Sequence, residues 1–177
     1  MFNLNSPLQR SSDYDVAFCT FCNRQSRNLF VRSLFRLVSR LGDGMFWYTL
    51  MGLLLLFYQG RALPAVLHML ASALVGTAIY KLVKSRTLRP RPFNVYPAIV
   101  CAGKTLDQFS FPSGHTMHAV SFSLIATFYF PALVWLVLPF TVLVALSRLV
   151  LGLHYPSDVL AGICLGTAIA VTSFHLV

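Results

Sequence analysis

Phe-Pro-Ser-Gly-His-Thr, residues Phe111 to Thr116, stands where a polar loop meets a long apolar run. A basic stretch, Lys84 to Pro92, precedes it, and Ser147-Arg148, His154 and Asp158 follow it. Cationic and histidine side chains can bind phosphate oxygens and take part in phosphoryl chemistry. We therefore expect the three stretches to form one phosphate-handling site, and the rest of the chain to serve mostly as a membrane anchor.

The composition indicates a membrane protein. Of the 177 residues, 56% are hydrophobic and only 11% are charged, with a mean hydropathy of +0.69, whereas soluble domains carry roughly 25% charged residues. We expect residues 1–26 to be a loosely ordered polar tail and residues 27–177 to form one membrane-embedded domain. The net charge of +9 favours anionic lipid headgroups or an anionic substrate. No base-reading motif is visible, so nucleic acid is not an expected partner.

Acidic and thiol side chains are too few for several common kinds of site. All five acids are Asp, so a carboxylate pair for glycosidase-type or two-metal chemistry is hard to assemble, and we expect no metal or other cofactor. Asp158 is the one acid within an apolar stretch. Cys19 and Cys22 form a lone C-x-x-C, a weak signal for zinc or redox chemistry, and we interpret them as ordinary thiols.

An amphipathic basic helix is expected over residues 27–41. Arg32, Arg36 and Arg40 recur every four residues among large apolar side chains, which suits a helix lying in the headgroup plane. A surface helix packed on the protein would show the same pattern, so both interpretations stay open. Gly42-Asp43-Gly44 ends this helix, and Asp43 can cap the next one.

Apolar runs predict about five membrane spans. Met45 to Gln59 and Ala62 to Val83 are the first two, and a last one runs from about Pro156 to Leu176. Residues 116–146 lack Asp, Glu, Lys and Arg, but one helix of that length would overshoot a ~30 Å bilayer core. We place a bend near Phe130-Pro131-Ala132, which gives two spans. The expected fold class is all-α: a polytopic bundle of about five transmembrane helices plus the N-terminal amphipathic interfacial helix.

This span count has a geometric consequence. The end of span two, the start of three, the end of four and the start of five emerge on one face of the membrane. Those points carry Lys84, His115, Arg148 and His154. Antiparallel packing of helices joined by short links therefore brings them together.

The residue types at this face suit phosphoryl transfer. His154 and Asp158 lie four apart at a helix start, so the carboxylate can fix one imidazole nitrogen and leave the other as a nucleophile. Ser113 and Gly114 precede a helix, where free N–H groups favour phosphate oxygens, and His115 is placed as a general acid. The alternative for this tetrapeptide is a serine cap beside a passing histidine.

Cationic side chains complete the expected site. Lys84, Arg91 and Arg148 can donate to the charged phosphoryl oxygens. Basic residues beside a span are commonly topology signals, and we interpret Arg86 and Arg89 in that way.

Taken together, three motifs resemble those of the type 2 phosphatidic acid phosphatase superfamily, which also includes vanadium haloperoxidases and glucose-6-phosphatase. They are Lys84, six residues, Arg91-Pro92; Pro112 to His115; and Ser147-Arg148, five residues, His154, three residues, Asp158. The resemblance covers about residues 44–176. It implies that His154 is the nucleophile of a phosphohistidine intermediate, that Asp158 orients it and that His115 protonates the leaving group and then activates water. The implied phosphate ligands are Lys84, Arg91, Ser113, Gly114 and Arg148, with no metal.

The resemblance implies metal-independent hydrolysis of a lipid phosphate. Phosphatidic acid, phosphatidylglycerol phosphate and polyprenyl phosphates or diphosphates all present a suitable terminal group. Two other classes stay open: a vanadate-dependent oxidoreductase of the haloperoxidase type, and a non-catalytic lipid-binding or transport module.

The expected location is a bacterial inner membrane, crossed several times. Bacterial lipid phosphatases of this family often show six spans, and here the helix of residues 27–41 stands where a first span could be. Apart from the proposed ligands, the face of the site carries more arginine than the opposite face, which has only Arg61; this bias favours a cytoplasmic site. The arginines concerned are Arg10, Arg24, Arg27, Arg32, Arg36 and Arg40.

Overall fold

Helices form all the extended regular elements of the described chain, which in this computed structural model comprises residues 13–105 and 107–176. The all-α prediction is therefore confirmed. The α-helices are α1 (Asp13–Arg24), α2 (Leu29–Arg40), α3 (Phe46–Tyr58), α4 (Leu63–Thr87), α5 (Pro92–Val95), α6 (Gly114–Tyr129), α7 (Val134–Val150) and α8 (Pro156–Phe174).

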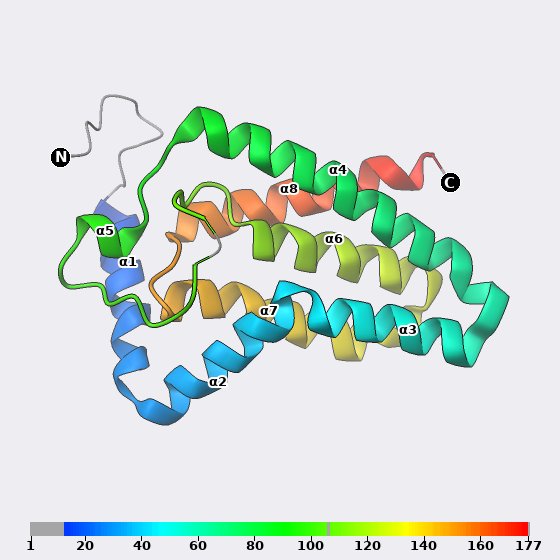
Figure 1. The fold of residues 1–177 in the computed structure, drawn as a ribbon, viewed down its shortest axis with the longest axis horizontal. Coiled ribbons are helices and arrows are strands. Elements are labelled where there is room, and N and C mark those ends of the chain that lie inside the picture. Colours follow the sequence, from blue (N-terminus) through cyan, green and yellow to red (C-terminus); the bar gives the residue numbers. More distant parts are fainter. Residues whose placement is uncertain (1–12, 106, 177) are drawn as a thin grey trace.

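Helix α6 lies at the centre of the bundle and packs against α4, α7 and α8 (Figure 1). Its closest neighbour is α8, because glycines let the two backbones approach. A Cβ built on Gly162 would lie 2.7 Å from the Ser113 carbonyl oxygen, and one on Gly166 would collide with the Met117 carbonyl oxygen. This contact fixes the start of α6, with the Pro-Ser-Gly-His stretch, against the start of α8.

The bend predicted near Pro131 is present. Helix α6 ends at Tyr129, residues Pro131–Leu133 form a single 3₁₀ turn, and α7 returns antiparallel to α6. Proline causes the break, because it disfavours helix for the residue before it. Two hydroxyls join the returning helices, with Ser123 Oγ 2.6 Å from Thr141 Oγ1.

Three helical stretches of the described residues are long and apolar enough to cross a membrane: Leu29–Thr87, Pro131–Val150 and Pro156–Phe174. The first contains α2, α3 and α4. Helix α6 has 16 residues, which makes it ~24 Å long and shorter than a ~30 Å bilayer core. Large apolar side chains such as Trp135, which is 86% exposed, cover the outside of the bundle, as expected for a surface that faces lipid.

The prediction of a loosely ordered N-terminal tail is wrong for residues 13–26, and its first 12 residues lie outside the described chain. Helix α1 buries a stripe of Asp15, Cys19 and Asn23, spaced four residues apart. The Asn23 amide donates to the carbonyl oxygens of Val100 and Val150, at 3.0 Å in each case. These buried residues are mostly polar, so apolar periodicity does not reveal the helix.

Helix α2 combines features of both interpretations of the amphipathic stretch. Val38 and Ser39 are buried where α2 packs on α7, while Phe30 remains 76% exposed. The predicted cap by Asp43 is wrong. Residues Leu41–Met45 form one wide turn before α3, and no side chain caps that helix. The Asp43 carboxylate contacts His115 instead.

Candidate active site

Four helix ends meet at one end of the bundle, as the antiparallel arrangement predicted (Figure 1). They are the C-terminal ends of α4 and α7 and the N-terminal ends of α6 and α8. A cavity of about 340 Å³ opens between them. Six of the eight predicted site residues line it: Lys84, Arg91, Gly114, His115, Arg148 and His154.

His154 lies in the short turn between α7 and α8. The backbone N–H groups of Leu153 and His154 both donate to the Arg148 carbonyl oxygen, which fixes the turn. The imidazole is buried, with Nε2 3.3 Å from Arg91 Nη1. Burial lowers the pKa of His154 well below its ordinary value, and the charges of Arg91 and Arg148 lower it further. The ring is therefore neutral, as a nitrogen nucleophile requires.

Asp158 lies behind His154, but other groups hold it more firmly. Its Oδ2 is 3.5 Å from His154 Nδ1, at the outer limit for a hydrogen bond. The same oxygen accepts the Tyr155 backbone N–H at 2.8 Å, and Oδ1 pairs with Arg89 Nη1 at 2.7 Å. Such contacts are often long in ligand-free enzymes. The expected orienting role of Asp158 stays a prediction.

Arg89 contacts the candidate site through Asp158, and sequence reasoning missed this contact. Its interpretation as a topology signal is wrong, because the side chain is buried and bridges Asp158 to Asp15 on α1, with Nη2 2.8 Å from Asp15 Oδ2. The guanidinium also lies 4.3 Å from the centre of the Tyr155 ring. A buried arginine needs acidic partners. Because this chain has so few acids, each buried acid was a candidate partner for an arginine, and this was the signal in the sequence that could have indicated the role of Arg89.

Helix α1 holds the turn that carries His154. Asp15 accepts the Ser157 backbone N–H at 3.0 Å, and the Cys19 thiol lies 3.6 Å from the His154 carbonyl oxygen. Burial raises the pKa of Cys19 to about 12, and Cys22 and nearby Asp charges raise it further, so the thiol stays protonated. Within the described residues, no cluster of three His, Cys, Asp or Glu side chains could hold a metal ion.

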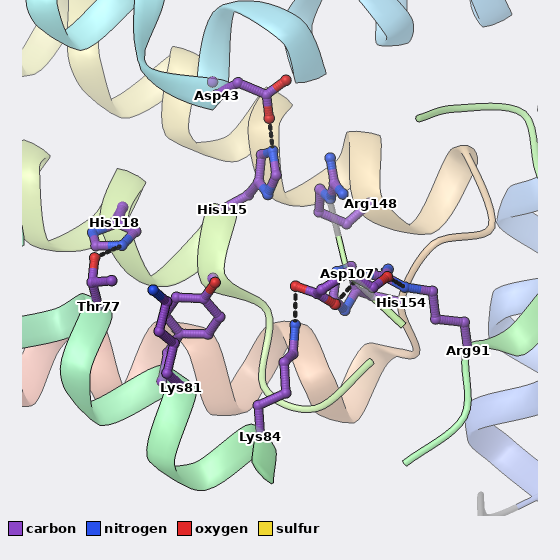
Figure 2. A pocket seen from close by; sticks show the side chains of 13 residues that line it. Asp43, Thr77, Lys81, Lys84, Arg91, Asp107, His115, His118, Arg148 and His154 are labelled. Carbon is purple, nitrogen blue, oxygen red and sulfur yellow. Dashed lines mark hydrogen bonds and ion pairs between the residues drawn. The ribbon is translucent and has the colours of Figure 1, made fainter. Parts of the chain in front are cut away.

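Asp107 occupies the space between two of the predicted phosphate ligands (Figure 2). Its Oδ2 lies 2.7 Å from Lys84 Nζ and its Oδ1 lies 2.8 Å from Arg91 Nη2. Partial burial raises the pKa of Asp107, but the hydrogen bond and charge of Lys84, with Arg91, outweigh this and hold the pKa below its usual value. The two carboxylate oxygens thus bind the cations as two phosphate oxygens could.

Ser39 and Asp43, at the corner between α2 and α3, each contact a predicted site residue. Arg148 is fully buried and donates from Nη1 to Ser39 Oγ at 2.5 Å. His115 contacts Asp43 through Nε2, so its Nδ1 is the nitrogen left for a ligand. Sequence reasoning missed both partners, because only the packing of α2 on α7 brings them to the site.

Ser113 differs in position from the other predicted ligands. Its side chain is buried and is not among the residues that line the cavity. Its Oγ lies 2.9 Å from Thr116 Oγ1, and its backbone N–H donates to the Asp158 carbonyl oxygen at 3.0 Å. The next residue, Gly114, does line the cavity. Ser113 therefore ties the start of α6 to α8, and its role in binding phosphate stays a prediction.

The motifs and their geometry agree with the comparison to known protein families, in which residues 65–177 match the PAP2 superfamily. The chain belongs to that superfamily. The resemblance inferred from the three motifs is thereby confirmed, and the matched residues of this PAP2 protein include every predicted site residue.

Curated relatives include two enzymes that act on polyprenyl compounds, according to their names. Over 102 residues the chain is 42% identical to decaprenylphosphoryl-5-phosphoribose phosphatase of Mycobacterium tuberculosis, a match covering 56% of this chain and 54% of that enzyme. The chain thus spans about half the length of that relative. It is also 30% identical over 141 residues to undecaprenyl-diphosphatase of Sulfolobus acidocaldarius, covering 78% of this chain and 67% of that enzyme.

Two solved structures share the fold. LpxE of Aquifex aeolicus aligns with a TM-score of 0.73 at 19% identity, covering 99% of each chain. A transmembrane PAP2-type phosphatidylglycerolphosphate phosphatase of Bacillus subtilis aligns with a TM-score of 0.69 at 23% identity, covering 92% of this chain and 84% of the other. At these identities the likeness concerns the fold alone.

Proposed function

We propose that this PAP2 protein is a membrane lipid phosphatase that hydrolyses a phosphomonoester or diphosphate without a metal, through a phosphohistidine intermediate. One observation carries the proposal. A buried, neutral His154 presents Nε2 to a cavity lined by Lys84, Arg91 and Arg148. Three cations around one uncharged nucleophile suit a phosphoryl group, whose negative charge they stabilise during transfer.

The first half of the reaction forms the intermediate. Substrate oxygens replace the Asp107 carboxylate on Lys84 and Arg91, and Arg148 binds the remaining charge. His154 Nε2 attacks phosphorus as the bond to the leaving oxygen breaks. His115 gives that oxygen a proton from Nδ1, while Asp43 holds the ring through Nε2.

The second half releases phosphate. His115, now deprotonated, accepts a proton from a water molecule that attacks the phosphorus of phosphohistidine. The N–P bond breaks and its electron pair returns to Nε2, which restores neutral His154. Asp158, held by Arg89 and the Tyr155 N–H, stabilises the positive charge that the ring carries in the intermediate.

A lipid substrate is supported by the setting of the cavity and by the relatives. The cavity lies at the end of helices whose outer surface is apolar, where the headgroup of a membrane lipid would lie. The names of both curated relatives described above refer to polyprenyl-linked phosphates, decaprenylphosphoryl-5-phosphoribose in one and undecaprenyl diphosphate in the other. We therefore favour this class of lipid.

The decisive experiment compares two histidine variants. We expect His154→Gln to lower phosphate release from detergent-solubilised lipid substrates by more than about 1,000-fold, because the nucleophile is lost. His175→Gln, the same change at an exposed site after α8, should leave the rate unchanged. Wild-type protein quenched during turnover should also carry a phosphohistidine, recognised as an acid-labile, base-stable phosphoramidate. A His154→Gln protein with the wild-type rate would exclude the proposal, and phosphate binding without turnover in the wild type would favour a binding module.

We further infer five spans, formed by α3, α4, α6, α7 and α8, with α2 at the interface and the site facing the bacterial cytoplasm. The long apolar stretches and the arginines of α2 support this topology. Cys101, an exposed thiol in the loop between α5 and α6, can test it. In a Cys22→Ser background, a membrane-impermeant maleimide should label Cys101 in inverted vesicles and not in intact spheroplasts. Labelling of Cys101 in intact spheroplasts would reverse the orientation.

A further inference from the structure

The cavity extends beyond the three motifs. Its other end is lined by Thr77, Tyr80 and Lys81 of α4 and by His118 of α6, none of which belongs to a motif. In Figure 2, Thr77 and His118 lie on the opposite side of His115 from Arg91 and His154. The cavity therefore has a motif end and a second polar end, with the proposed general acid between them.

The second end lies deeper in the bundle. Thr77, Lys81 and Lys84 are spaced by four and three residues, so they share the face of α4 that lines the cavity. His118 follows His115 by one turn of α6 in the same way. Each spacing of three or four residues along α4 or α6 places the next side chain ~5 Å further from the motif end, toward the part of the bundle surrounded by lipid tails.

Polar groups at this second end lack strong internal partners. His118 Nε2 lies 3.4 Å from Thr77 Oγ1, a weak contact. His118 Nδ1 is buried and has no hydrogen-bond partner among the described residues. The Tyr80 ring lies near both ends, with Lys84 Nζ 5.2 Å from its centre and the centre of the His118 ring 6.4 Å away. An unpartnered buried nitrogen is costly, which indicates that a ligand satisfies it.

The geometry of the attack on phosphorus determines which part of a substrate lies at the second end of the cavity. The nucleophile and the leaving oxygen lie roughly in line on opposite sides of phosphorus. His154 attacks from the motif end, and His115 protonates the leaving oxygen. The leaving group therefore extends past His115 toward Lys81 and His118.

We propose that Lys81, Thr77 and His118 bind a second phosphate group, so that the substrate is a lipid diphosphate rather than a lipid monophosphate. This inference rests on the proposed function. A monophosphate would place its first apolar carbons against an ammonium, a hydroxyl and an imidazole, and their desolvation is unfavourable without new hydrogen bonds. A second phosphate supplies oxygens for all three groups, and Lys81 offsets its charge.

The reaction balances with water as the only co-substrate. His154 Nε2 bonds to the terminal phosphorus, and the bond from that phosphorus to the bridging oxygen breaks. The bridging oxygen keeps the electron pair and takes the proton of His115, so that lipid monophosphate leaves. Water then cleaves the N–P bond and yields inorganic phosphate. Lys81 acts by binding the phosphate that remains on the lipid.

A matched substrate pair tests the proposal. Farnesyl diphosphate and farnesyl monophosphate share one lipid chain, and phosphate release from each gives a ratio of kcat/KM values. We expect the wild type to favour the diphosphate, and Lys81→Met to lower the ratio about tenfold, the effect of losing one charge-assisted contact. Lys81→Arg should keep most of the ratio. His118→Phe should lower it as well, and Arg86→Gln, on an exposed position of the same helix, should not change it.

The outcomes separate this inference from the proposed function. A wild type that prefers the monophosphate, or a Lys81→Met ratio equal to that of the wild type, would overturn the second phosphate site and leave the phosphatase intact. An equal loss on both substrates would assign Lys81 to general binding and would also overturn it. If the wild type released phosphate from neither substrate nor from phosphatidic acid, the proposed function itself would fail.

Discussion

The two ends of the cavity are built differently. At the motif end, Lys84, Arg91 and Arg148 are buried, and each makes an ion pair or hydrogen bond of 2.5–2.8 Å. At the other end, Lys81 is exposed and the contact between Thr77 and His118 measures 3.4 Å. Rigid, desolvated cations suit the phosphoryl group that reacts, because they need not reorganise. The looser end suits selection among leaving groups.

Of the changes considered, removing a cation of the motif end should lower activity most. We expect Arg148→Met to lower kcat at least about 100-fold, because a preorganised donor to the developing charge is lost. The Lys81→Met change should cost about tenfold, on diphosphate alone. Steady-state kinetics of both proteins will measure the difference. Equal effects would mean that the two ends share one role, and thermal unfolding curves will show whether Arg148→Met remains folded.

Variants of Arg89 test whether residues behind the motif end, which contact it through Asp158, also affect catalysis. Its contact with Asp158 predicts that Arg89→Gln lowers kcat about 10- to 100-fold with little change in KM, because Asp158 no longer supports the charged ring of His154. Arg89→Lys should recover part of the rate. Asp15→Asn should reduce kcat less, since Asp15 acts through Arg89 and Ser157. A rise in KM with kcat preserved would assign Arg89 to substrate binding instead.

Under the proposed function, Asp107 should weaken inhibition by the product, inorganic phosphate. Its carboxylate stays ionised above its lowered pKa and competes with phosphate for Lys84 and Arg91. We expect Asp107→Asn to lower the inhibition constant of inorganic phosphate by about three- to tenfold, as one charge-assisted contact is weakened. Gln108→Glu, the opposite charge change at an exposed neighbour, serves as a control for general surface charge. An unchanged constant would show that Asp107 does not compete.

The smallest expected difference between the two ends is in the pH dependence of kcat/KM. Under the proposed mechanism His154 reacts when neutral. Burial lowers its pKa most, and the charges of Arg91, Arg148 and Lys84 lower it further. Removing the charge of Lys84 raises the pKa of His154, so activity on the acid side should be lost at a higher pH in Lys84→Met. Lys81→Met should leave the acid limb of kcat/KM in place. A shift in both variants, or in neither, would contradict the electrostatic separation of the ends.

Sequence reasoning identified the parts of the site that lie in short motifs. Lys84, Arg91, His115 and His154 line one cavity, as their short motifs predicted, while their roles stay predictions. Pro131 marked the bend because proline disfavours helix for the residue before it. Arg89, Asp107 and Asp43 were missed as site residues, since ion pairs between distant segments leave no periodic pattern. Helix α1 was missed for a related reason. Its buried stripe is polar and bonds to backbone of the loops, so hydropathy does not reveal it.

The contact of α1 with the start of α8 sets an order of assembly. Asp15 and Ser157 are separated by 142 residues. At ~5–20 residues per second of synthesis, Asp15 waits roughly 7 to 30 seconds for its partner to leave the ribosome. Until α8 has inserted, Asp15 cannot contact Ser157, and Arg89 cannot contact Asp158. Helix α1 thus completes its contacts only after α8 is in place, and under the proposed function the nascent chain cannot act on lipid before then.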